Sequence, residues 1–179
     1  MPEHDLIPTP GQTIGPFFHN ALSYDGGAEL VPPGSAGAIR FHGTVLDGAR
    51  EPVPDALVEI RQADTEGDVP KVEGSLHRGG KTFTGWGRAA TDRDGRYAFV
   101  TVEPDAPFIA IAVFARGLLN RLFTRAYLPG AEDAFLSSLS DERRSTLVAV
   151  RDPNSDLRFD IVLQGDAETV FLTYPRHRA

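Results

Sequence analysis

The sequence predicts a mainly β protein, a β-sandwich with one short helix and an extended N-terminal arm. Short segments rich in β-branched and aromatic residues recur along most of the chain, each bounded by Gly, Pro, Asp or Asn. Only one segment carries a helix start signal, and the first 38 residues are rich in Pro and Gly without a periodic pattern. We therefore divide the chain into an arm, residues 1–38, and a sandwich domain, residues 39–179.

The arm contains one segment with a specific pattern, TPGQTIGPFF at residues 9–18. The rest of the arm has too few apolar residues to form a core of its own. We expect it to lie on another subunit, over an interface well above the ~1,600 Å² of standard pairs.

Six strands are predicted in the sandwich domain, and their alternating apolar residues indicate one buried and one exposed face. The segments are residues 39–47, 56–64, 96–104, 108–116, 122–128 and 157–165. Alternation is visible at Ala56, Val58 and Ile60 and again at Phe159, Ile161 and Leu163. Several short strands at this spacing are typical of a sandwich.

One helix is predicted, from Asp141 to Leu147. Ser140 can accept a hydrogen bond as its N-cap, and acidic residues in the first turn favour the positive end of the helix dipole. The glycine-rich stretch at residues 69–89 is predicted to be an excursion between two strands. It contains the single tryptophan, Trp86, which is assigned either to the core or to an interface.

Composition excludes several functional classes. The 179 residues fit one domain with a substantial core, since 41% are hydrophobic and 24% are charged. The absence of cysteine excludes disulfides, thiolate metal sites and a cysteine nucleophile. The net charge of −7 disfavours nucleic-acid binding. No apolar run approaches the ~18 residues of a membrane span, and the N-terminus lacks a secretory pattern, so we expect a cytoplasmic location.

Motifs for metal binding are weak. The histidines show no pair at the spacing by which a strand or helix presents two ligands together; they are His4, His19, His42, His77 and His177. Asp92, Asp94 and Gly95 begin like a calcium loop, and Glu103 stands where its last ligand belongs. Residues 97–102 are predicted to be strand, however, so a hairpin turn is favoured. No GxSxG elbow supports serine catalysis.

Arg116 is the most informative single residue. It follows the apolar segment that begins at Phe108, and Gly117 comes next. An arginine at the end of a rigid strand is well placed for a specific contact. Two interpretations stay open, a buried ion pair and the binding of an anion.

Residues 43–69, GTVLDGAREPVPDALVEIRQADTEGDV, resemble the core of the intradiol ring-cleavage dioxygenases. The similarity continues at residues 87–104, 124–130 and 157–171, and so covers most of the chain from about Thr9 to Leu172. The resemblance implies the β-sandwich of that family. It also implies a ferric ion held by two tyrosines and two histidines. This ligand set suits the metal, since phenolate oxygens favour Fe(III).

This chain departs from the family at every expected iron ligand. Val69 stands where the first tyrosine should be, and the shortened loop VEPDAP at residues 102–107 offers no second tyrosine. Phe108 and Ala110 occupy the expected His-x-His positions. We therefore expect no metal site and no catalytic residue on this chain.

QTIGPFF at residues 12–18 and FARG at residues 114–117 resemble the α subunits of the two-chain members of the family. The resemblance implies a homologous β subunit that holds the Fe(III), in a hetero-oligomer of αβ units. It places Thr13 and Arg116 in the substrate cavity of that partner. The implied reaction is cleavage of protocatechuate by O₂ to 3-carboxy-cis,cis-muconate, in the β-ketoadipate pathway of aromatic catabolism.

Two other functions are compatible with a sandwich. The first is an independent ligand- or protein-binding module that has lost its iron, which predicts a soluble monomer. The second is a self-sufficient enzyme with a different metal site, which the histidine spacing disfavours. The subunit hypothesis predicts instead a chain that is poorly soluble without its partner, since an apolar face would be uncovered.

Overall fold

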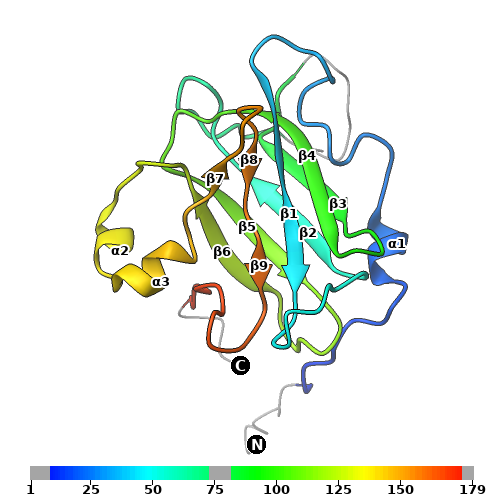
Figure 1. Ribbon diagram of the computed structural model, residues 1–179. Helices are drawn as coiled ribbons and strands as arrows, with labels where there is room; N and C mark the ends of the chain where they lie inside the picture. Colours follow the sequence, from blue (N-terminus) through cyan, green and yellow to red (C-terminus); the bar gives the residue numbers. More distant parts are fainter. Residues whose placement is uncertain (1–8, 73–81, 175–179) are drawn as a thin grey trace, which may run out of the picture.

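Two β-sheets lie face to face in the computed structural model, which describes residues 9–72 and 82–174 (Figure 1). The five-stranded sheet has the order β4-β1-β8-β7, and β9 also pairs with β1. Its strands are β1 (Ala38–Leu46), β4 (Arg96–Val102), β7 (Val150–Arg151), β8 (Leu157–Arg158) and β9 (Ile161–Val162). The four-stranded sheet has the order β3-β2-β5-β6, with β3 (Trp86–Ala90), β2 (Leu57–Arg61), β5 (Phe108–Phe114) and β6 (Leu122–Tyr127). The predicted sandwich is confirmed.

The core lies between the sheets because alternate residues of the long strands point inward. Phe41 of β1 pairs with Phe99 of β4, and both rings are fully buried. On the facing sheet, Ile60 of β2 pairs with Ile111 of β5 in antiparallel register. Burial of such side chains contributes about 1.5–3 kcal/mol each. Leu30, ahead of β1, is also buried in this core.

The last predicted strand, residues 157–165, is interrupted between β8 and β9. The carbonyl of Phe159 accepts a hydrogen bond from the buried Tyr97 hydroxyl, and the Asp160 carboxylate accepts one from the backbone N–H of Thr44 at 3.0 Å. Gly43 permits this break, since a Cβ there would lie 1.8 Å from the Phe159 oxygen. The side chain of Asp160 thus replaces a ladder bond.

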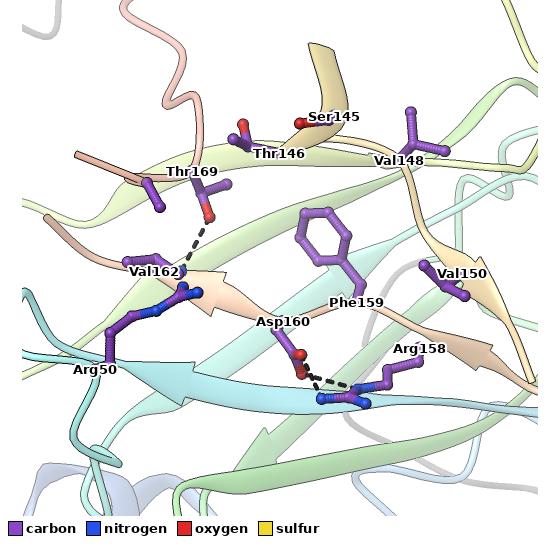
Figure 2. A pocket seen from close by; sticks show the side chains of 11 residues that line it. Arg50, Ser145, Thr146, Val148, Val150, Arg158, Phe159, Asp160, Val162 and Thr169 are labelled. Carbon is purple, nitrogen blue, oxygen red and sulfur yellow. Dashed lines mark hydrogen bonds and ion pairs between the residues drawn. The ribbon is translucent and has the colours of Figure 1, made fainter. Parts of the chain in front are cut away.

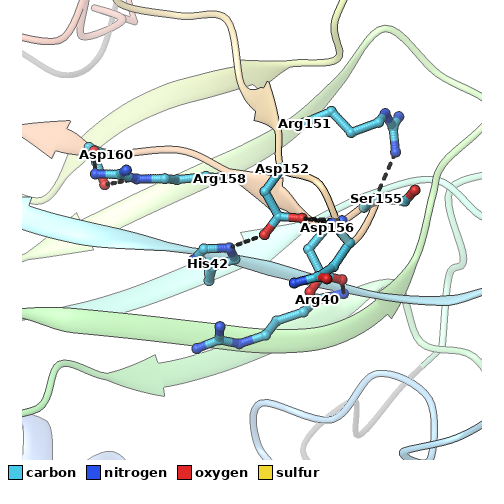
Figure 3. Close-up of polar contacts among 9 residues, drawn as sticks. Arg40, His42, Arg151, Asp152, Ser155, Asp156, Arg158 and Asp160 are labelled. Carbon is cyan, nitrogen blue, oxygen red and sulfur yellow. Dashed lines mark hydrogen bonds and ion pairs between the residues drawn. The ribbon is translucent and has the colours of Figure 1, made fainter.

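One type of turn occurs four times among the described residues, and it explains the calcium-like motif. In each copy the first aspartate accepts hydrogen bonds from the backbone N–H groups two and four residues later. The fourth residue has a positive φ, which glycine adopts most easily. The turns begin at Asp47, Asp64, Asp92 and Asp152, and their fourth residues are Arg50, Gly67, Gly95 and Ser155. Figure 3 shows the copy at Asp152, whose carboxylate also lies 3.5 Å from His42.

A turn is present at Asp92 as predicted, but it is not the predicted hairpin turn. It connects β3 to β4, which belong to different sheets, so it does not close a hairpin. The carboxylate of Asp92 is occupied by two backbone N–H groups, the role of an Asx turn rather than of a metal ligand.

Within the part of the chain that the structure describes, three short helices replace the single predicted one: α1 (Phe18–Leu22), α2 (Ala134–Ser137) and α3 (Asp141–Ser145). Ser140 caps α3 as predicted, by accepting from Arg143 N. The helix ends at Ser145 rather than Leu147, because the N–H groups of Thr146 and Leu147 donate to carbonyls three residues earlier instead of four. The Leu147 carbonyl then accepts from Tyr127 N of β6 at 2.8 Å. None of the helices in the described ranges is long and apolar enough to cross a membrane.

The predicted excursion at residues 69–89 ends in a strand, because Trp86 opens β3 along β2. Its ring stacks on Tyr24 with centroids 6.4 Å apart, and the Arg88 guanidinium lies over it at 5.0 Å. Trp86 is therefore half-buried on the outer face of the sheet, where residues ahead of β1 cover it. It does not belong to the core between the sheets.

Candidate functional site

The strand β5 ends beside a tight turn that carries Arg116. Inward-facing residues of β5 are buried in the core, and Ala115 is buried directly after the strand. Gly117 has a φ of +89°, so the chain turns sharply after Arg116. The base of the Arg116 side chain is thus held by a rigid element, as the sequence predicts.

Arg116 forms an ion pair through Nε with Oδ2 of Asp55, a residue just ahead of β2. The Asp55 side chain is only 10% exposed, whereas that of Arg116 is 56% exposed. Among residues 9–72 and 82–174, the terminal NH₂ groups of Arg116 have no hydrogen-bond partner. Of the two interpretations of Arg116, the ion pair is present in the structure. It uses Nε and leaves the terminal NH₂ groups of the guanidinium available to an anion.

Thr13 lies against the same turn. Its Oγ1 accepts a hydrogen bond of 2.7 Å from the backbone N–H of Gly117. The arm is thereby fixed to the residue that follows Arg116, although 104 positions separate the two bonded residues. The structure brings the two predicted site residues together.

Two cavities flank this turn. One of about 470 Å³ is lined by Arg116, Asp55 and Gln164, among others. The other, of about 270 Å³, lies between the arm and the segment after the turn and is lined by Phe18 and Leu119, among others. Leu119 is 61% exposed at the edge of this second cavity.

The positions expected for iron ligands carry no donor atoms. Phe108 and Ala110 lie on the outward face of β5, where the Arg125 guanidinium stacks over the Phe108 ring at 4.2 Å. Val69 is an exposed loop residue. In the described ranges, no group of three or more His, Cys, Asp or Glu side chains could hold a metal ion. Phe108, Ala110 and Val69 therefore do not fit a ferric ion. Three of the histidines considered above, His4, His77 and His177, lie outside the described residues.

Two tyrosines of the sandwich are engaged in structural contacts. Burial raises the pKa of Tyr97 well above its ordinary value, and the negative charge of Asp160 adds to the effect. Burial also raises the pKa of Tyr127, whose hydroxyl donates to Asp133 at 2.8 Å. The phenolate form that binds Fe(III) is therefore disfavoured at both residues.

Sequence reasoning missed Asp55 and Gln164, which line the cavity beside Arg116. Asp55 follows Pro54 in a segment that predicts only a turn before a strand. Its contact with Arg116 arises because β2 pairs with β5, which places the residues ahead of β2 beside the end of β5. No local sequence pattern predicts this contact.

Comparisons with known proteins agree on one family. A family model described as "Dioxygenase" matches residues 15–110. The chain is 36% identical to the protocatechuate 3,4-dioxygenase alpha chain of Burkholderia cepacia, over 93% of this chain and 97% of that one. It is 33% identical to the beta chain of the same enzyme from that organism, over 86% and 74% of the two chains. A dioxygenase domain from Streptomyces sp. SirexAA-E superposes with a TM-score of 0.59 at 26% identity, covering 89% of this chain and 99% of that one.

Proposed function

Because this chain belongs to the intradiol dioxygenase family, we propose that it is the iron-free α subunit of a protocatechuate 3,4-dioxygenase. Its partner would be a β subunit of the same fold that binds the Fe(III). The observation that carries the proposal is the outward face of β5, where Phe108 and Ala110 replace ligands while the strand and its sheet are retained. A chain that lacks the iron-ligand side chains but retains the fold is expected where the role of the chain is to associate with a partner subunit.

The similarity to both chains of one enzyme supports a pair of homologous subunits. The relatives of this chain include an alpha chain at 36% identity and a beta chain at 33% identity. Two chains of one fold can associate about a pseudo-twofold axis, which brings equivalent surfaces together. The exposed Phe17 and Leu119 side chains, 78% and 61% accessible, are suited to burial in that association.

We propose that Arg116 and Thr13 line the substrate cavity of the partner. Protocatechuate carries a ring carboxylate, and a guanidinium can pair with a carboxylate through two parallel hydrogen bonds. Nε of Arg116 is turned to Asp55, so its terminal NH₂ groups are the ones that would face the substrate. Thr13 contributes by holding the turn through Gly117 N.

In the proposed reaction both atoms of O₂ enter the product. The ring bond between the two hydroxyl-bearing carbons breaks to give 3-carboxy-cis,cis-muconate, and no external electron donor is consumed. The role of this chain is to attract and orient the substrate. A location in the cytoplasm, predicted from the sequence, is part of the same proposal.

Co-expression tests the proposal directly. The chain should be poorly soluble alone and should form a hetero-oligomer with an intradiol β chain that takes up O₂ when protocatechuate is added. Size measurement and oxygen uptake are the readouts. A stable monomer that does not associate with the β chain would favour the independent binding module instead.

A further inference from the structure

A third cavity lies at the interruption between β8 and β9 (Figure 2), where Arg50, Thr146 and Asp160 are among the residues that line it. Its volume of about 400 Å³ falls in the range of small-molecule sites. The apolar part of its wall comprises Val148, Val150, Phe159, Val162 and Ala167. The site described above shares none of these residues.

Of the charged side chains that line this cavity, Arg50 has no carboxylate partner among the described residues. Arg158 is paired with Asp160 at 2.6 Å, and the Thr169 hydroxyl accepts from Val162 N at 3.0 Å. Arg50 also lines the cavity, and within the described part of the chain no carboxylate pairs with its guanidinium. The two arginines and one aspartate leave a net charge of +1 beside an apolar wall.

The backbone at Arg50 makes this arginine noteworthy. It is the fourth residue of the recurrent turn, with a φ of +67°, where two other copies use Gly67 and Gly95. A non-glycine residue in the left-handed region costs about 1–2 kcal/mol. Such strain, when it is found in a structure, directs attention to a function of the side chain.

We propose that this cavity binds a small organic monocarboxylate with a compact apolar body. The carboxylate would pair with the guanidinium of Arg50, which matches it in geometry and balances its single charge. The apolar body would lie against Phe159 and the neighbouring valines. The proposal does not depend on the function assigned to Arg116.

Benzoate is the probe, with benzyl alcohol as its uncharged counterpart and inorganic phosphate as an anion without an apolar body. The valine methyl groups of this chain are isotope-labelled, in the hetero-oligomer if the chain needs its partner. Benzoate should shift the methyl signals of Val148, Val150 and Val162 saturably, with a Kd of about 1 mM or tighter. Benzyl alcohol and phosphate should bind at least about 10-fold more weakly, since each lacks one part of the interaction.

Two glycine variants form a matched pair. Arg50→Gly and Ser155→Gly both relieve the same backbone strain, so both should raise the unfolding temperature. Only Arg50→Gly should weaken benzoate binding, by about 10-fold or more. The proposal is overturned if the wild-type valine signals do not move, if benzyl alcohol binds as tightly as benzoate, or if Arg50→Gly binds benzoate as the wild type does.

Discussion

Replacing Arg116 by alanine should raise the KM of the assembled enzyme for protocatechuate about tenfold and leave kcat nearly unchanged. A hydrogen bond to a charged group contributes about 1.5–3 kcal/mol. The lower end applies here, because the Arg116 side chain is 56% exposed and its Nε already pairs with Asp55. A loss of about 1.4 kcal/mol corresponds to a factor of ten. Oxygen uptake measures the kinetics, and the iron content of the same preparations should not change.

Asp55→Asn separates a binding role of Arg116 from a purely structural one. The substitution removes the competing carboxylate, so a substrate-binding Arg116 should keep or lower the KM. Catechol, which lacks the ring carboxylate, should show the same KM with wild type and Arg116→Ala. If Arg116 only anchors Asp55, both variants should lower the unfolding temperature and neither should change the KM for protocatechuate. Equal KM values for wild type and Arg116→Ala would refute the reasoning.

Three further predictions concern the fold that holds the site. Gly43→Ala would place a Cβ 1.8 Å from the Phe159 oxygen, so we expect a loss of about 3 kcal/mol and a fall of about 6 °C or more in the unfolding temperature. Thr13→Val removes the acceptor for Gly117 N and should speed proteolysis of the arm, while the unfolding temperature of the sandwich stays constant. Burial alone would raise the pKa of Asp133, but hydrogen bonds from a backbone N–H and a tyrosine hydroxyl, with a nearby arginine, outweigh it and lower that pKa. The stabilisation is therefore present above about pH 4 and lost as the pH falls through the folded-state pKa, so the unfolding free energies of wild type and Asp133→Asn should converge at low pH.

Each of these predictions has a distinct contrary result. Gly15→Ala is the control for Gly43→Ala, since no atom lies within 4 Å of a Cβ at that position. Equal unfolding temperatures for the two variants would contradict the packing argument. An arm cleaved at the wild-type rate in Thr13→Val would show that its hydrogen bond does not hold it. A pH-independent difference for Asp133→Asn would show that the carboxylate charge is unimportant.

The long strands could be predicted from the sequence because their own residues determine which face is buried. Phe108–Phe114 is a continuous apolar run that predicts a strand, and β5 has these bounds, two residues shorter than the predicted segment 108–116. The strand β3 could not be predicted, since WGRAA becomes a strand only by pairing with β2. The strand β7 pairs with the nearby β8 across the turn at Asp152, but its two residues are too few to show a pattern. Two of the recurrent turns were hidden for another reason, because Arg50 and Ser155 stand where glycine would mark the turn.

The sequence predicts the part of the candidate site that lies at the end of β5, because the apolar run marks where that strand ends. Arg116 and Thr13 were identified from motifs in the sequence, and the hydrogen bond through Gly117 brings their segments together. The ion pair with Asp55 could not be foreseen, because it depends on how β2 and β5 pair and on a side chain that belongs to a turn. The cavity at Arg50 depends in the same way on the interruption of one strand by Tyr97 and Asp160.

The most direct test of the central claim is an iron assay on this chain purified in the absence of any β subunit, refolded if necessary and supplied with ferric ion. Because Phe108, Ala110 and Val69 offer no donor atoms, we predict a colourless protein with far less than one iron per chain. One tightly bound iron per chain, with the visible absorption of a tyrosinate–Fe(III) pair, would contradict the account.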